Sequence, residues 1–164
     1  MVLFDFTRAG PLPPWTPIGD VVMGGVSNSA FAVSPEGCAI FSGSLSLEQS
    51  GGFASVRSPT LECDLSACTG ITLRVSGDGK RYKINLRSDS FFDAVQYQAP
   101  LLPLREEWTE IRIPFTNFLP VFRGVVLPGA PPFQKSSLCS IGFLIAEKQV
   151  GEFRLRIGSI GAYR

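Results

Sequence analysis

The side chains able to carry out catalysis are limited, because the sequence contains no histidine. Without an imidazole, Ser-His-Asp and Cys-His nucleophiles and histidine-ligated metal sites are excluded. A pair of carboxylates could still hydrolyse a glycosidic bond. The acids that cluster, however, are Glu106, Glu107 and Glu110 around Trp108, a pattern typical of a solvated turn that leads into a strand. We therefore expect a binding protein and not an enzyme.

The four cysteines, Cys38, Cys63, Cys68 and Cys139, are widely scattered. Structural zinc sites usually combine two close pairs of ligands, and only Cys63 and Cys68 lie near each other. The chain opens directly on an apolar strand pattern, without the features of a signal or transit peptide. No apolar stretch approaches the ~20 residues that span a bilayer. We expect a cytoplasmic protein with free thiols and no cofactor, which reaches a membrane only through a partner.

Apolar residues alternate with polar ones in several segments, which is the pattern of strands with one buried face. The clearest are 71–76, 81–87, 110–113 and 152–157, and the further expected strands are 2–6, 38–47, 53–57, 94–99 and 141–146. Together they predict one all-β domain over residues 1–164, an antiparallel β-sandwich. The expected inward-facing residues are Ile71, Leu73, Val75, Tyr82, Ile84, Leu86, Ile111, Ile113, Phe153, Leu155 and Ile157.

The remaining segments are predicted to be irregular. Residues 115–119 can form one turn of helix, which Pro120 would end. Residues 123–134 contain three prolines and two glycines, which predicts a long loop, and such loops in compact domains are often functional.

Basic residues gather on the outward positions of the predicted strands. Gly77 to Lys80 is interpreted as a hairpin turn between 71–76 and 81–87, which would place Arg74 across from Lys83. Arg81, Lys83 and Arg87 share one face, and Arg112, Arg154 and Arg156 would join them if their strands belong to the same sheet. This face is either an ordinary solvated face or a platform for an anionic partner such as RNA, an acidic protein surface or lipid headgroups. The net charge of +1 favours neither nucleic acid nor an acidic membrane.

Several segments resemble motifs of the complex I intermediate-associated protein 30 family, in order and over about residues 5–160. They are WTPIGDVVMGGVS at 15–27, FSGSLSL at 41–47, GGFASVR at 51–57, GDGKRY at 77–82, Trp108, IPF at 113–115, FRG at 122–124, IGFLI at 141–145 and GEF at 151–153. The resemblance implies a galactose-binding-like jelly roll and a role in assembling membrane redox complexes, as for mitochondrial respiratory complex I, or in photosystem biogenesis. Because the chain shows neither a transit peptide nor a fused nucleotide-binding domain, we expect a free-standing version.

The same motifs suggest a partner surface on loops. The expected partner-binding residues are Asp20, Met23, Gly24, Gly25, Ser27, Gly52, Phe53, Arg57, Asp78, Arg81 and Arg123. Glycines allow close approach of another backbone, Met adapts to an irregular apolar partner, and Arg supplies directional contacts. The competing interpretation is structural: both glycine pairs form turns, Phe53 enters the core, and Arg57 pairs with Asp20 or Asp78.

Three functions fit these features. The first is a protein-binding module that acts as an assembly factor or chaperone for subunits of a membrane complex. The second is a carbohydrate-binding module, which the fold would allow, although sugar binding favours exposed aromatic rings and the chain has only 2 Trp and 3 Tyr. The third is an RNA-binding domain that uses the basic face.

Overall fold

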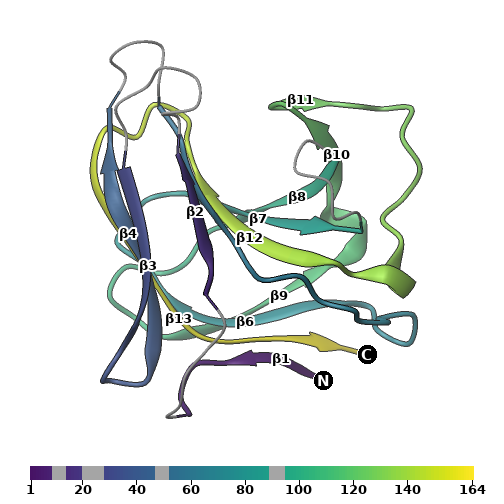
Figure 1. Cartoon of the computed structure of the whole chain (residues 1–164), viewed down its shortest axis with the longest axis horizontal. Helices are drawn as coiled ribbons and strands as arrows, with labels where there is room; N and C mark the ends of the chain where they lie inside the picture. Colours follow the sequence, from purple (N-terminus) through teal and green to yellow (C-terminus); the bar gives the residue numbers. More distant parts are fainter. Residues whose placement is uncertain (9–13, 20–27, 47–51, 89–94) are drawn as a thin grey trace.

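The computed structural model describes residues 1–8, 14–19, 28–46, 52–88 and 95–164. In this part of the chain, two antiparallel sheets pack face to face (Figure 1). The six-stranded sheet has the order β3-β4-β13-β6-β9, with β1 also paired to β13, and the seven-stranded sheet has the order β11-β10-β8-β7-β12-β5-β2. The predicted antiparallel β-sandwich is therefore confirmed.

The strands are short except for β13. The six-stranded sheet contains β1 (Val2–Asp5), β3 (Asn28–Ser34), β4 (Cys38–Leu45), β6 (Gly70–Ser76), β9 (Thr109–Pro114) and β13 (Gly151–Tyr163). The seven-stranded sheet contains β2 (Thr16–Gly19), β5 (Ala54–Arg57), β7 (Tyr82–Arg87), β8 (Gln96–Leu101), β10 (Leu119–Phe122), β11 (Val125–Val126) and β12 (Ser140–Ile145). Two 3₁₀ turns, η3 (Phe115–Asn117) and η4 (Lys135–Ser137), complete the described elements.

The core lies between the sheets and contains the residues that alternation predicted. Ten of the eleven expected inward-facing residues are buried, and Ile111 is half-buried against the same cluster. Rings from distant segments join them, with Trp15 stacked on Phe31 and on Phe143. Because each fully buried large apolar side chain stabilises the fold by about 1.5–3 kcal/mol, this shared core holds both sheets in place.

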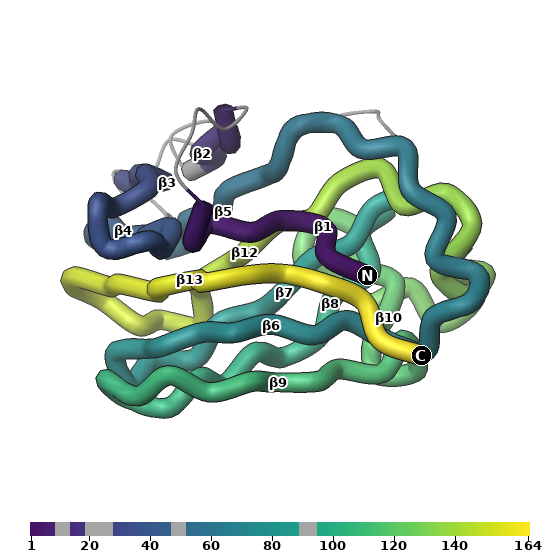
Figure 2. Tube along the Cα trace, turned by 90° about the horizontal axis from the view of Figure 1, so that it is seen from below, coloured from purple at the N-terminus to yellow at the C-terminus, as the bar shows by residue number. Residues whose placement is uncertain are grey.

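Strand β13 extends well beyond the predicted 152–157. Its pairing with β6 changes register between Ile157 and Ser159, so the alternation is interrupted there. Gly161 also hides the pattern: a Cβ at this position would lie 2.6 Å from the carbonyl oxygen of Met1. The missing side chain lets β1 lie close against β13. Figure 2 shows β1, β13, β6 and β9 side by side, with both termini at the same end.

Three predictions about the connecting segments need correction. Strands β6 and β7 belong to different sheets, so residues 77–81 cross between the layers instead of forming a hairpin. Arg74 accordingly pairs with Ser159 and Glu110, not with Lys83. The expected loop at 123–134 begins with a small hairpin, because β11 pairs with β10. Pro120 does not end a helix; it lies within β10.

Candidate functional site

The outer face of the seven-stranded sheet is concave. Figure 1 shows β2 on one side, β10 and β11 on the other, and β12 and β7 along the floor, with the six-stranded sheet beneath. Alternation decides which side chains face outward: Val56, Ile84 and Leu86 are buried in the core, so their neighbours in sequence point to the concave side. We name this surface the concave face; its floor consists of Ser55, Arg57, Lys83, Asn85, Arg87, Gln98 and Gly142.

A polar row crosses the floor from strand to strand. In register, Arg57 pairs with Gly142, Gly142 with Asn85, and Asn85 with Gln98. The amide nitrogen of Gln98 donates a hydrogen bond to Oδ1 of Asn85 at 2.8 Å. At Gly142, a Cβ would lie 2.6 Å from the carbonyl oxygen of Val56, so the middle of the row carries no side chain. The row therefore presents amides and a guanidinium beside an open central position.

Two arginines on this floor are unusually buried for a surface. Arg87 is 2% exposed and Arg57 is half-buried. Burial, together with the positive charge of Arg87, lowers the pKa of Arg57 to about 10. Both arginines also interact with other groups in the chain. Since desolvated cations are costly unless compensated, these interactions help to keep both guanidinium groups in the floor.

Lys83 lies at the edge of the floor. Its Nζ is 3.1 Å from Oε1 of Glu147, and Nε of Arg81 is 3.3 Å from Oε2 of the same carboxylate. Hydrogen bonds from Lys83 and Arg81 lower the pKa of Glu147. These two cations are thus partly neutralised by the turn that follows β12.

An apolar rim borders the floor along β10 and β11. Leu119 is 53% exposed and Val126 is 48% exposed, and Leu119 pairs with Gln98 of the polar row. At the turn of this hairpin the guanidinium of Arg123 lies 5.2 Å from the centre of the Phe122 ring. On the opposite side Phe53, just before β5, is half-buried and lies outside the core cluster. The structural interpretation, with Phe53 in the core, is therefore not supported.

The structure brings together only part of the predicted site. Gly52, Phe53, Arg57 and Arg123 all belong to the seven-stranded sheet or its connections. Asp20, Met23, Gly24, Gly25 and Ser27 lie outside the described residues, so their placement in the site stays a prediction. Asp78 lies elsewhere, in the crossover between the sheets.

Asp78 has a structural role. Its Oδ2 accepts hydrogen bonds from the Tyr82 hydroxyl at 3.0 Å and from the Arg154 backbone N–H at 2.7 Å, and its Oδ1 accepts one from the Lys80 N–H. Burial and the nearby Asp78 charge raise the pKa of Tyr82. The carboxylate therefore ties the crossover to β13, and the hypothesis that Asp78 pairs with Arg57 is wrong.

The predicted basic face is divided between the two sheets. Arg74, Arg112, Arg154 and Arg156 share the outer face of the six-stranded sheet, whereas Lys83 and Arg87 lie on the concave face. A single platform that contains all of them does not exist, because β6 and β7 are in different layers.

Sequence reasoning missed Asn85, Gln98, Leu119 and Val126. Asn85 alternates with buried Ile84 and Leu86, so the period-2 pattern could have assigned it to the outward side. Leu119 and Val126 lie in segments interpreted as a helical turn and a loop. Their exposure follows from the β10–β11 hairpin, and the sequence pattern around each residue does not predict it.

The described residues show little that could hold a metal. Cys38, Cys63, Cys68 and Cys139 are free, and burial raises the pKa of the Cys38 and Cys63 thiols. Within the described ranges, no three Cys, Asp or Glu residues are grouped as metal ligands would be. In the same ranges, no helix has the length and apolar character required to cross a bilayer.

Comparison with known proteins finds one matching sequence family and similar individual sequences. The profile of the complex I intermediate-associated protein 30 family matches residues 4–157. The mitochondrial complex I intermediate-associated protein 30 of Mus musculus is 30% identical, over 99% of this chain and 56% of its own length. The Drosophila melanogaster protein of the same name is 25% identical, over 98% of this chain and 62% of its own length. The chain thus spans little more than half of these relatives.

Solved structures with the same fold include carbohydrate-binding modules. The family 11 module of the cellulase Lic26A-Cel5E of Clostridium thermocellum has a TM-score of 0.69 at 17% identity, covering 99% of this chain and 93% of the module. The agarase AgWH50C has a TM-score of 0.65 at 11% identity, covering 99% of this chain and 26% of the enzyme. At such identities the likeness shows the galactose-binding-like jelly roll and nothing about ligands.

Proposed function

This chain belongs to the complex I intermediate-associated protein 30 family, and on that basis we propose that it is a non-catalytic protein-binding module that helps to assemble a membrane redox or photosynthetic complex. Its partners would be subunits of that complex. A cytoplasmic location, with the membrane reached through the partner, is part of the same proposal.

The concave face carries this proposal. It combines a floor of amides and cations with an exposed aliphatic rim at Leu119 and Val126. Protein interfaces are built in this way, with an apolar patch beside directional polar contacts. Met23, whose place on this surface is part of the proposal, would add an adaptable apolar contact.

Carbohydrate binding is the main competing function. Sugars are usually held by flat aromatic rings, yet the described outward positions of β5, β12, β7 and β8 contain no aromatic residue. RNA binding on one basic platform loses support because the platform is split between two sheets. A glycan array and an RNA mobility-shift assay can detect carbohydrate binding and RNA binding directly.

The test is affinity capture of the full chain from native membranes in mild detergent, with co-purified subunits identified by mass spectrometry. Leu119→Asp should abolish capture of these subunits, because it places a charge on the apolar rim, and should leave the melting temperature nearly unchanged. Val33→Asp is the matched control, since Val33 is 44% exposed but lies in the six-stranded sheet; it should retain capture. Met23→Asp should behave like Leu119→Asp.

Retention of the subunits by Leu119→Asp would contradict the proposal. Saturable binding on a glycan array, or an RNA mobility shift that Arg57→Ala abolishes and Arg112→Ala preserves, would replace it by the corresponding alternative. If Met23→Asp unfolds the protein, Met23 belongs to the core and not to the partner surface.

A further inference from the structure

A small pocket lies at the end of the sandwich, on the outer side of the six-stranded sheet and away from the concave face. It has a volume of about 160 Å³ and is lined by Ser76, Gly77, Asp78, Arg105, Glu106, Arg154 and Arg156. One ordered water needs roughly 10–15 Å³, so the pocket has room for a small ion with its hydration.

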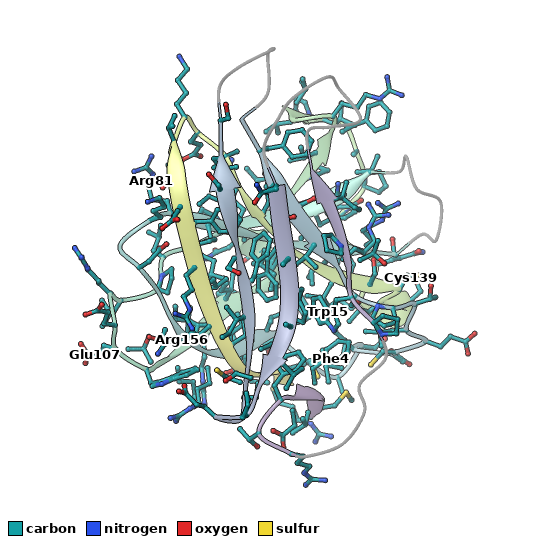
Figure 3. All side chains as sticks on the ribbon, turned by 60° about the vertical axis from the view of Figure 1, so that its left-hand side comes forward. Phe4, Trp15, Arg81, Glu107, Cys139 and Arg156 are labelled. Carbon is teal, nitrogen blue, oxygen red and sulfur yellow. The ribbon has the colours of Figure 1, made fainter. Side chains whose placement is uncertain are left out.

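The walls of this pocket are held by backbone contacts. Arg154 and Arg156 project from β13, where Arg156 pairs with Ser76 of β6. The loop that carries Arg105 is fixed to Gly77, because the Gly77 N–H donates to the Leu104 carbonyl and the Glu106 N–H donates to the Gly77 carbonyl, both at 2.9 Å. Figure 3 shows Arg156 directed away from the core, on the side from which Glu107 also projects.

The three arginines of the pocket form no salt bridge with any residue in the described part of the chain. Among the described residues, none of them has a carboxylate oxygen within 4.0 Å. Arg112 on the same sheet face differs, because its Nε is 3.3 Å from Oε1 of Glu110 and its guanidinium lies over the Tyr163 ring. Within the described residues, the pocket is therefore lined by three arginines that no carboxylate neutralises at salt-bridge distance.

The two acids of the pocket offset only part of this charge, because three arginines stand against two carboxylates in its lining. Asp78 accepts hydrogen bonds from Tyr82, Lys80 and the Arg154 backbone, so its carboxylate is occupied. Glu106 is exposed and can turn toward solvent. Three arginines from two separate segments, β13 and the loop before β9, line one pocket, and arginine is suited to binding phosphate oxygens through paired hydrogen bonds.

We propose that this pocket binds a phosphate group, carried by a small phosphomonoester or by a lipid headgroup. The inference is independent of the partner-binding function, since it concerns the other sheet. It adds an anion-dependent contact that the chain can make while the concave face is occupied by a partner.

The experiment titrates inorganic phosphate into the full chain at constant ionic strength, with chloride as the balancing ion, and follows the melting temperature and the heat of binding. Wild type should show saturable stabilisation. Arg156→Ala should bind about tenfold more weakly or worse, because a charge-assisted hydrogen bond is lost, and Arg156→Lys should be intermediate. Arg112→Ala is the matched control and should bind within about twofold of wild type, since its charge is already paired; Leu119→Asp should bind as wild type does.

Two further arms identify the source of the phosphate. Glycerol 3-phosphate represents soluble phosphomonoesters, and vesicles of phosphatidylcholine with phosphatidic acid represent lipid headgroups. Binding in either arm that Arg156→Ala weakens and Arg112→Ala preserves supports the pocket. If Arg156→Ala does not fold, Arg105→Ala on the loop replaces it. No saturable effect in wild type, or equal losses in Arg112→Ala and the pocket variants, would overturn the proposal.

Discussion

Both outward sheet faces of this protein carry cations, and the two faces differ in how deeply those cations are buried. On the concave face, Arg87 is almost fully buried and Arg57 is half-buried. On the outer face of the six-stranded sheet, Arg74 and Arg112 are exposed and stack over Trp108 and Tyr163. Because an exposed cation on a sheet needs no explanation, the two faces differ in the burial of their cations and not in the presence of cations.

The two arginines of the concave floor also lie near each other. Arg57 and Arg87 are close enough that the positive charge of Arg87 helps to lower the pKa of Arg57. On the other sheet, Arg74 and Arg112 lie over aromatic rings, and Arg154 and Arg156 line the small pocket. Both faces are held in position by the shared core and by the crossover at residues 77–81. Substitutions in the core and in the crossover should therefore affect both faces.

The largest effect is expected in the core beneath the concave floor. Leu86 is fully buried, so Leu86→Ala should lower the free energy of unfolding by about 2–5 kcal/mol through a cavity. Urea unfolding followed by fluorescence measures this loss. A loss of unfolding free energy below about 1 kcal/mol would contradict this prediction. It would mean that the Leu86 side chain contributes little to the packing beneath Asn85 and Arg87.

The next effect concerns the crossover that links the two faces. Asp78→Ala leaves the buried hydroxyl of Tyr82 and the N–H of Arg154 without their acceptor, which should cost about 2–4 kcal/mol. Asp64→Ala is the control, because Asp64 only caps an exposed turn through Ser66; it should cost less than about 1 kcal/mol. Equal effects of the two variants would show that Asp78 does not hold the sheets together.

Tyr82 provides a smaller and pH-dependent test of the same link. Tyr82→Phe should cost about 1–2 kcal/mol at neutral pH, since one hydrogen bond to a carboxylate is lost. The pKa of Tyr82 is raised in the folded state from the usual value of 10.0. The folded protein therefore retains this proton above pH 10 while the unfolded chain releases it, and stability falls as pH rises. Denaturation between pH 9 and about 11 should be steeper for wild type than for Tyr82→Phe; parallel curves would contradict this.

The smallest effect is expected at the edge of the concave face. Lys83 and Arg81 lower the pKa of Glu147, so its stabilising contribution is present above the unfolded value of 4.5 and is lost as pH falls through the lower folded value. Because the pair is exposed, Glu147→Gln should cost less than about 1 kcal/mol at pH 7. The difference from wild type should shrink at pH 3, as measured by urea unfolding at both pH values.

The sequence alone determined the fold class and the main core. Alternation in 71–76, 81–87 and 152–157 identifies the buried side of each strand, because in a β-strand this depends only on neighbouring residues. The same local rule explains why ten of eleven expected core residues are buried. The family resemblance was also readable from ordered motifs, and the sequence profile confirms it.

The tertiary structure alone decided which strands share a sheet, and with that where the cations lie. The residues from Gly77 to Lys80 suit a hairpin turn as well as a crossover, so the turn cannot show that β6 and β7 separate. Arg87 and Arg74 each follow a buried leucine in an alternating segment, yet one is buried on the concave face and the other is exposed on the opposite sheet. Pairing between distant strands sets that difference, and this pairing is not encoded within a few residues of either arginine.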